Sequence, residues 1–434
     1  MHRSRVNPRG RVRQWRSIAA HDVIRTAAAV SAAVIAVMIV KAQAPSAVPP
    51  TRRGTSDGVP TAHLNYQPGR LPNLVSVALA DTIMARYPDY RDAYWKPWTY
   101  VHGYVFLAFE RLYRDTGDRK YLDFIRRYID SFVDEQGGFT ASKLDNLDDL
   151  MTGNAIVGLY ERTGEDRYRI AATRFLRALD DYPRSSDGQF WHGKRAANMW
   201  IDGIFMGQMF VIRYGHSIGE SGSCWDEATR QITVFAKHAQ KGDSGLYYHA
   251  WTEQAPKPDW ADPKTGLSPE VWSEGLGWYA LVIPETLAVL PKDHPRRAAV
   301  EDIFRRLAAG LKRTQDPETG GWYMIVDQRG KPGNWIDPSG TAMFVYSLRR
   351  GIELGLLDAD EYGPVAKRGY ASLLQFVKVN DRGLVDLTGG GDGISIKKDF
   401  AAYVGVPRRV NAKETVAGVL WASEIMERSR LQRR

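Results

Sequence analysis

The sequence predicts an all-helical protein whose helices pair into six hairpins and close into one ring, an (α/α)6 barrel. Three observations support this prediction. Apolar residues recur at helical spacing in twelve segments, a glycine-aromatic signal separates alternate segments, and we find no strand-rich stretch large enough for a second domain. A closed barrel is favoured over an open solenoid because solenoid repeats usually keep a tighter period than this chain does.

Twelve segments from about residue 72 onward have apolar residues three and four positions apart, the period of an amphipathic helix. They are Leu71–Tyr87, Val101–Thr116, Tyr121–Val133, Asp149–Thr163, Arg167–Tyr182, Met199–His216, Trp225–Ala239, Pro269–Leu290, Arg297–Arg313, Ser339–Leu356, Tyr362–Val379 and Ala412–Glu427. We expect consecutive helices to pair as hairpins.

A glycine followed by aromatic residues recurs between alternate helices, with a short extended stretch expected at each copy. The copies are Gly137-Gly138-Phe139, Gly188-Gln189-Phe190-Trp191, Gly245-Leu246-Tyr247-Tyr248 and Gly320-Gly321-Trp322-Tyr323, with a weaker one at Gly383-Leu384. In a closed barrel the ends of the inner helices and their loops surround one cleft, so we look for functional residues there.

The first 44 residues predict an export signal. Basic residues precede the apolar run Thr26–Val40, and Ala42-Gln43-Ala44 provides an A-x-A cleavage pattern. The run is short for a membrane span, so we expect a cleaved signal peptide, with a retained membrane anchor as the alternative. Residues 45–70, rich in Pro, Ser, Thr and Gly, predict a linker, and residues 71–430 the catalytic domain. The domain is expected in the periplasm or outside the cell.

The basic charge of the chain is concentrated in this leader. The net charge is +9, but residues 1–44 hold eight Lys and Arg residues against one Asp. A nucleic-acid-binding protein would keep its basic patch in the folded part, so we exclude that class. The lone Cys224 cannot form an internal disulfide, which leaves stability to the core.

Asp202 begins an otherwise apolar helical segment, directly after Trp200 and Ile201. Aspartate favours helix starts, so an ordinary capping role is one interpretation. The apolar neighbours favour another, because a carboxyl group in apolar surroundings tends to keep its proton and can donate it near neutral pH. Asp202 is therefore our candidate general acid.

A second acidic cluster, Asp145-Asn146-Leu147-Asp148-Asp149, precedes the predicted helix Leu150–Thr163. Three aspartates cannot all be helix caps. One of them at the cleft edge would supply the second of the paired carboxylates that glycosidic chemistry commonly uses. The alternative is a solvated helix start.

Two histidines, His192 and His249, lie among aromatic residues. Neither has the spacing of a metal ligand relative to another histidine. We expect each to have a core role or to contact a sugar hydroxyl, and we predict no metal and no other cofactor.

Several motifs, in order along residues 72–428, resemble glycoside hydrolase family 105, which is related to family 88. They are Trp98-Thr99-Tyr100-Val101-His102-Gly103, Leu147-Asp148-Asp149-Leu150-Met151-Thr152-Gly153, Phe190-Trp191-His192, Met199-Trp200-Ile201-Asp202-Gly203, Tyr248-His249-Ala250-Trp251, Gly275-Leu276-Gly277-Trp278-Tyr279 and Ser339-Gly340-Thr341-Ala342-Met343-Phe344.

The resemblance implies an (α/α)6 barrel and a hydrolase that acts on oligosaccharides left by a polysaccharide lyase. Such an enzyme removes the 4,5-unsaturated uronic acid at the non-reducing end: an aspartic acid protonates C4, water adds at C5, and the hemiketal opens. Asp202 corresponds to the acid and Asp148 to the family's second aspartate. The positions that correspond to substrate contacts are Tyr100, His192, Trp200, His249 and Trp278.

Glu274 departs from the family's pattern. Members commonly carry an arginine just before the Gly-x-Gly-Trp-Tyr stretch, where this chain has Trp272-Ser273-Glu274. We expect Glu274 at the cleft, where an anion discourages the contact that arginine makes with an anionic sugar. Two other functions therefore stay open: a related hydrolase acting on a neutral or differently substituted glycan end, and an inactive glycan-binding protein. The sequence indicates neither the parent polysaccharide nor the oligomeric state.

Overall fold

The computed structural model describes residues 65–93 and 96–433. The predicted export signal and most of the predicted linker lie outside these residues. Within them, no helix is long and apolar enough to cross a membrane.

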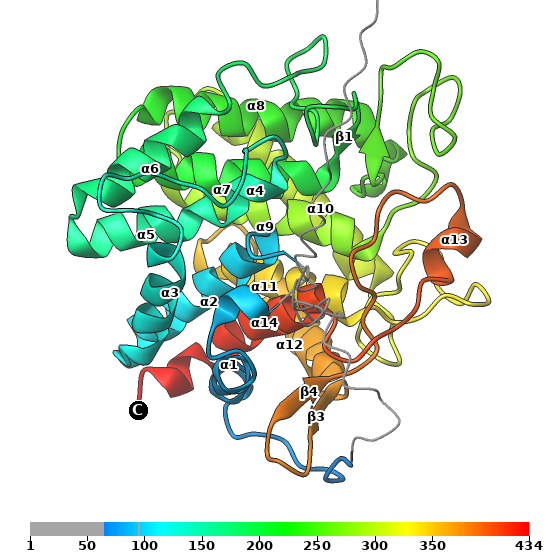
Figure 1. The fold of residues 1–434 in the computed structure, drawn as a ribbon. Helices are drawn as coiled ribbons and strands as arrows, with labels where there is room; N and C mark the ends of the chain where they lie inside the picture. The colour runs from blue at the N-terminus through cyan, green and yellow to red at the C-terminus, as the bar shows by residue number, and fades with distance from the viewer. Residues whose placement is uncertain (1–64, 94–95, 434) are drawn as a thin grey trace, which may run out of the picture. The chain divides into compact units, whose positions relative to one another are not determined.

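Six inner helices form a closed ring (Figure 1). Each inner helix packs against the next inner helix along the chain, and the last inner helix packs against the first. In order they are α2 (Tyr100–Thr116), α5 (Gly153–Thr163), α7 (Ile201–Ser217), α9 (Ser273–Val289), α11 (Pro338–Glu353) and α14 (Lys413–Leu431). The short helix α4 (Asp148–Met151) leads directly into α5. The closed ring confirms the predicted barrel.

Each of six outer helices packs mainly on one inner helix. They are α1 (Val75–Arg86), α3 (Lys120–Asp130), α6 (Asp166–Arg177), α8 (Ser221–Ala239), α10 (Arg297–Thr314) and α12 (Ala359–Leu374). The first outer helix, α1, packs on the last inner helix, α14. Glu427 of α14 accepts hydrogen bonds from the backbone N–H groups of Val75 and Ser76, at 2.9 and 3.0 Å. The two ends of the domain thus form the sixth hairpin.

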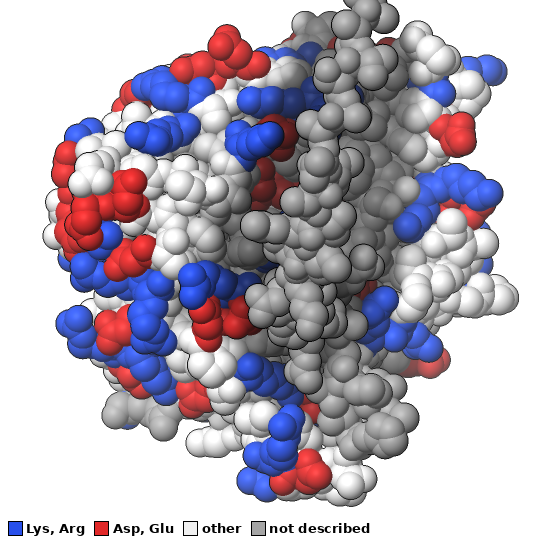
Figure 2. Space-filling model, in the orientation of Figure 1, with Lys and Arg blue, Asp and Glu red and all other residues white. Residues whose placement is uncertain are grey.

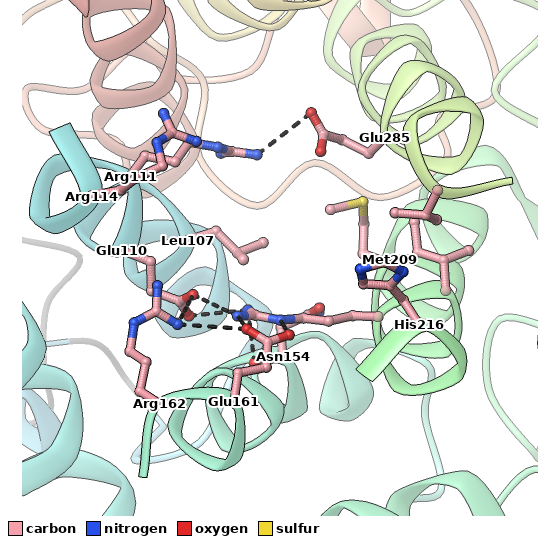
Figure 3. Close-up of a pocket in the computed structure, with 13 residues that line it drawn as sticks. Leu107, Glu110, Arg111, Arg114, Asn154, Glu161, Arg162, Met209, His216 and Glu285 are labelled. Atoms are coloured by element: carbon pink, nitrogen blue, oxygen red, sulfur yellow. Dashed lines mark hydrogen bonds and ion pairs between the residues drawn. The ribbon is translucent and has the colours of Figure 1, made fainter. Parts of the chain in front are cut away.

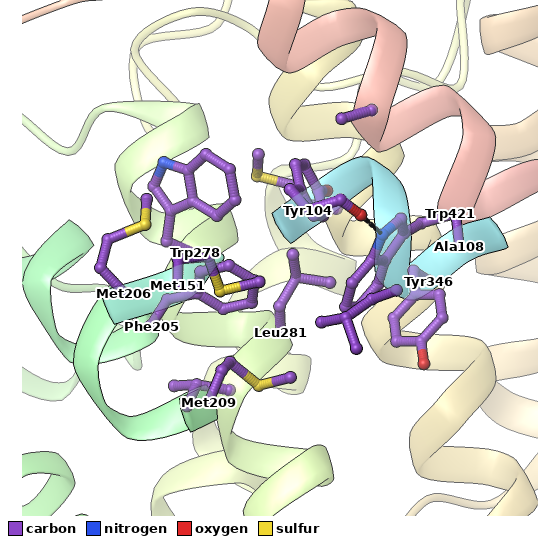
Figure 4. Close-up of a cluster of buried hydrophobic side chains, with 14 of the residues drawn as sticks. Tyr104, Ala108, Met151, Phe205, Met206, Met209, Trp278, Leu281, Tyr346 and Trp421 are labelled. Atoms are coloured by element: carbon purple, nitrogen blue, oxygen red, sulfur yellow. Dashed lines mark hydrogen bonds between the residues drawn. The ribbon is translucent and has the colours of Figure 1, made fainter. Parts of the chain in front are cut away.

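Aromatic side chains fill the barrel axis (Figure 4). Trp278 packs against Tyr104 and Phe205, with ring centroids 4.8 Å apart in both pairs. Trp421 packs on Tyr104 and donates from its indole N–H to the backbone oxygen of that residue at 2.6 Å. The inner helix α7 is apolar on nearly every side. It is packed on every side, because two neighbouring inner helices, one outer helix and the aromatic core at the barrel axis surround it.

The recurring glycine-aromatic loops turn the chain in the same way. The first glycine of every copy has a φ between +70° and +94°, which an L side chain rarely adopts: Gly137, Gly188, Gly245, Gly320 and Gly383. In three copies the aromatic residue then pairs back toward the end of the preceding helix, as Phe139 does with Val133.

The described residues also form two short antiparallel pairs of strands. In these, β1 (Met199–Trp200) pairs with β2 (Ala250–Trp251), and β3 (Val377–Val379) pairs with β4 (Val385–Leu387). The sequence predicts a helix through Val379, but α12 ends at Leu374. The β-branched Val377 and Val379 instead pair with β4 across a tight turn. Three further short helices are η2 (Tyr90–Asp92), η3 (Gly242–Ser244) and α13 (Phe400–Val404).

Arginine and glutamate side chains from the C-terminal halves of the inner helices surround a cavity of about 380 Å³ (Figure 3). Arg213 contacts Glu110 and Glu161, each at 2.6 Å. Arg111 stacks on Trp421 at 3.8 Å. The charges here largely satisfy one another, so we attribute to this network the role of holding this end of the barrel together.

Candidate active site

The N-terminal ends of the inner helices converge on a second cavity of about 380 Å³, at the other end of the barrel. This volume lies in the range of small-molecule sites. The lining residues are Tyr100, Asp148, His192, Trp200, Asp202, Met206, Trp272, Glu274, Asp392, Gly393, Ile394, Ser395 and Lys413. Since α2, α4, α7, α9 and α14 each supply a lining residue from their first two positions, the barrel itself brings together segments far apart in the sequence.

Backbone hydrogen bonds between neighbouring loops fix the entry to each inner helix. The N–H of Ile201 donates to the carbonyl of His249 at 3.0 Å, beside the β1–β2 pair. The N–H of Leu147 donates to the carbonyl of His192 at 3.0 Å. These two contacts place His249 next to Asp202, and His192 next to Asp148.

Asp202 is the second residue of α7 and is 7% exposed. It does not cap this helix: Trp200 is the N-cap residue, and no side chain makes a capping hydrogen bond there. The Oδ2 atom lies 3.2 Å from Nε2 of His249, without the alignment of a hydrogen bond. The Nδ1 atom of the same ring lies 2.7 Å from the hydroxyl of Tyr403. The carboxyl group is thus held at the cavity wall, away from bulk water.

Asp148, the first residue of α4, faces the same cavity. Its Oδ1 atom lies 3.5 Å from Nε2 of His192, whose ring stacks on Trp200 with centroids 4.3 Å apart and planes 6° apart. Burial raises the pKa of Asp148; His192 opposes this shift and the negative charge of Asp202 adds to it. Asp148, whose ionisation the charge of Asp202 disfavours, therefore faces one cavity together with Asp202, beside a flat aromatic surface.

The other two aspartates of the acidic cluster have different surroundings. Asp149 accepts a hydrogen bond from the hydroxyl of Ser142 at 2.6 Å. Asp145 lines an adjoining pocket of about 430 Å³, which shares His192 and Trp200 with the main cavity. Of the three, only Asp148 lines the main cavity.

Glu274 lines the cavity from the first turn of α9 and is 3% exposed. Its Oε2 atom lies 2.7 Å from the hydroxyl of Ser339, which also lies 2.8 Å from Oδ1 of Asp337. Burial raises the pKa of Glu274 well above its usual range, and the nearby charges of Glu414 and Asp337 raise it further. The residue in the place of the family's arginine is thus a buried acid that favours its neutral form.

Two residues with expected substrate contacts lie behind the cavity wall. Trp278 is 1% exposed and belongs to the aromatic core, because it lies one helical turn beyond Glu274, toward the barrel axis. Trp278 therefore does not line this cavity, and its contact with substrate stays a prediction. His249 is also 1% exposed and contacts Asp202 instead of lining the cavity.

Several lining or supporting residues were missed in the sequence, among them Trp272, Asp392, Tyr403 and Lys413. A sequence signal existed for two of these four. Asp392 follows three consecutive glycines, a pattern typical of a loop. Lys413 begins the last helical segment, as Asp202 begins an earlier one. Nothing in the sequence marks Tyr403, which reaches His249 from the short helix α13.

Figure 2 shows one face of the molecule. Over the described part of this face, basic and acidic side chains alternate, and no large patch carries charge of a single sign.

Comparison with known proteins identifies the family. The family model described as Glycosyl Hydrolase Family 88 matches residues 75–430. A solved glycoside hydrolase of family 105 from C. acetobutylicum is 31% identical, with a TM-score of 0.76 over 81% of this chain and 99% of that one. Protein Atu3128 of Agrobacterium fabrum is 34% identical over 188 residues, 42% of this chain and 78% of that protein. An unsaturated 3S-rhamnoglycuronyl hydrolase of Formosa agariphila is 21% identical over 292 residues, 64% of this chain and 73% of that protein.

The matched region spans both the first and the last helix of the barrel, so the likeness covers the whole ring and the cavity at its end. This chain is a glycoside hydrolase of the family 88 and family 105 group.

Proposed function

We propose that this glycoside hydrolase removes a 4,5-unsaturated uronic acid from the non-reducing end of oligosaccharides produced by a polysaccharide lyase. The observation that carries the proposal is that Asp148 and Asp202 face one cavity beside the stacked His192 and Trp200. The name of the Formosa agariphila relative, an unsaturated rhamnoglycuronyl hydrolase, supports the same substrate class.

Asp202 is the proposed general acid. It gives its proton to C4 of the double bond, and water adds at C5. The resulting hemiketal opens its ring, which leaves a hemiacetal at C1 that releases the rest of the oligosaccharide. His249, 3.2 Å from Asp202, steadies the carboxylate that remains after proton transfer. Asp148, beside His192, orients the sugar or the attacking water, and Trp200 offers a flat surface to the apolar face of the sugar.

A panel of disaccharides tests this proposal. The purified chain is incubated with lyase-generated unsaturated disaccharides, and loss of the ultraviolet absorbance of the C4–C5 double bond is followed. Saturated disaccharides of the same sugars serve as controls. In D2O the product should carry deuterium at C4, because the transferred proton comes from a carboxyl group that exchanges with solvent. Ordinary displacement at C1 first releases a free unsaturated uronic acid that still holds the double bond, so product that appears before the absorbance falls indicates displacement.

Two other outcomes correspond to the alternative functions. Cleavage of saturated or neutral glycans, without turnover of unsaturated uronides, indicates a related hydrolase with another substrate. Binding of the disaccharides without cleavage indicates an inactive glycan-binding protein.

We also propose that residues 1–44 direct export, so that the barrel acts in the periplasm or outside the cell. The proposal rests on the order of basic, apolar and A-x-A segments in the sequence. Cell fractionation followed by sequencing of the mature N-terminus tests it. Cleavage after Ala44 indicates a signal peptide, an intact membrane-bound chain indicates an anchor, and a full-length protein found only in the cytosol contradicts export.

A further inference from the structure

The cavity contains one cationic side chain among the described residues that line it, Lys413. Lys413 is the first residue of α14, and its side chain is 7% exposed. The Nζ atom lies 2.7 Å from Oδ1 of Asp392 and 2.8 Å from Oε1 of Glu414. Burial works to lower the pKa of Lys413, but Glu414 and Asp392 outweigh burial and the net shift is upward. The ammonium group therefore stays charged at the cavity wall.

The carboxylates around Lys413 differ in how firmly they are held. Glu414 is fully buried and also accepts a hydrogen bond from the hydroxyl of Tyr100. Asp392 lines the cavity from a loop with glycine at positions 389, 390, 391 and 393. The side chain of Asp392 is 10% exposed, whereas that of Glu414 is completely buried. Asp392 is therefore the carboxylate that can leave Lys413.

Glu274, across the cavity, cannot supply the positive charge that an anionic sugar needs. A hydroxyl group has one hydrogen, and that of Ser339 lies between Glu274 and Asp337. Asp337 also accepts bonds from Ser273 and from two backbone N–H groups, as an ionised helix cap does. The second contact of Ser339 then requires a proton on one of the two carboxyl groups. Burial raises the pKa of both, and that of Glu274 well above its usual range. Glu274 in its acid form adds no negative charge, but it offers no cation either.

We propose that Lys413 pairs with the carboxylate of the terminal uronic acid, and that Asp392 occupies this position until the substrate displaces it. The proposal rests on the function proposed above and names the residue that selects an acidic sugar. Exchanging one carboxylate for another leaves the number of anions around Lys413 unchanged. An anionic substrate can then enter an already acidic cavity without adding an unpaired buried charge.

The test compares an unsaturated disaccharide with its methyl ester at the uronic carboxyl, for wild type, Lys413→Met, Asp392→Asn and the control Lys398→Met. Lys398 is an exposed lysine near Asp392 that does not line the cavity. The measured quantity is the ratio of kcat/KM for the acid to kcat/KM for the ester. This ratio is independent of the fraction of folded enzyme, so a partly unfolded variant remains informative.

We expect wild type and Lys398→Met to prefer the acid, and Lys413→Met to reduce that preference by about 10- to 100-fold, the range for a lost charge-assisted hydrogen bond. Asp392→Asn should lower KM for the acid and leave KM for the ester unchanged. An unchanged ratio in Lys413→Met, or a wild type that prefers the ester, overturns the assignment of Lys413. A higher KM for the acid in Asp392→Asn overturns the exchange. If wild type processes neither compound, the proposed function itself fails and the inference fails with it.

Discussion

The Nε2 atom of His249 lies 3.2 Å from Oδ2 of Asp202, and its Nδ1 atom lies 2.7 Å from the hydroxyl of Tyr403. The hydroxyl of Tyr403 can donate its hydrogen to Nδ1. A neutral imidazole then carries its hydrogen on Nε2, facing Asp202.

The first prediction concerns this chain of contacts. Tyr403→Phe removes the hydroxyl that sets the tautomer of His249 and leaves the ring volume nearly unchanged. We expect kcat for unsaturated disaccharides to fall about 5- to 10-fold, the effect of one buried hydrogen bond, with KM nearly unchanged and the pH–rate profile altered. The control is Tyr346→Phe, which removes the hydroxyl that donates to Glu285 at the other end of the barrel. If both variants have the same pH–rate profile as wild type, Tyr403 does not position His249.

The second prediction concerns the paired carboxyl groups. Asp148→Asn removes a negative charge next to Asp202, so the site as a whole releases its proton more readily. We expect the alkaline limb of the kcat profile to move to lower pH, together with a loss in kcat of about 100-fold. Asp149→Asn is the matched control, since Asp149 is the next residue but does not line the cavity. A profile of Asp148→Asn that coincides with wild type would show that the two aspartates act independently.

The third prediction concerns the protonation of Glu274. Its pKa is raised in the folded state, so the protein gains stability from its protonation below the unfolded pKa and loses that stability as the pH rises toward the folded pKa. Glu274→Gln keeps the shape without the titrating proton. We expect its melting temperature, relative to wild type, to rise steadily from pH 5 to pH 8. A difference that stays constant over this range would mean that Glu274 is ionised in the folded protein, as it is in the unfolded chain.

Much of this fold follows from the sequence, because helical periodicity and glycine turns are local signals. The twelve predicted helical segments all contain a helix, and only their ends differ. The segment predicted to end at Val379 ends earlier because Val377–Val379 has a strand partner in Val385–Leu387, and such a partner is not visible in local periodicity.

The site was less completely predictable, for the same physical reason. Asp148 and Asp202 begin helices, Trp200 lies just before one and His192 lies in the loop before β1; the structure places all four around one cavity. A motif does not tell how deep a residue lies along its helix, so nothing in the sequence shows that Trp278 packs in the aromatic core. Lys413 and Asp392 face the cavity because the ring closes and α14 packs against α2. This contact joins residues far apart in the sequence, so a local sequence pattern does not predict it.

The fourth prediction separates the two tryptophans. Trp278→Ala should destabilise the protein by about 3–5 kcal/mol, because it leaves a cavity in the aromatic core, yet the folded fraction should keep the KM of wild type. Trp200→Ala should raise KM, because it removes the ring on which His192 stacks at the cavity wall. Thermal unfolding and steady-state kinetics of both variants test this. A large rise in KM for Trp278→Ala, without one for Trp200→Ala, would reverse the assignment.

The measurement that tests the central claim most directly is kcat of Asp202→Asn on an unsaturated disaccharide, with binding of the same compound measured by calorimetry. Asparagine nearly preserves the shape of the side chain and cannot donate an acidic proton. General acid catalysis contributes about 10²–10⁴-fold in rate, so we predict a loss of kcat of at least that order, with circular dichroism and affinity close to wild type. If Asp202→Asn keeps more than about a tenth of the wild-type kcat, Asp202 is not the general acid, and Asp148 becomes the better candidate.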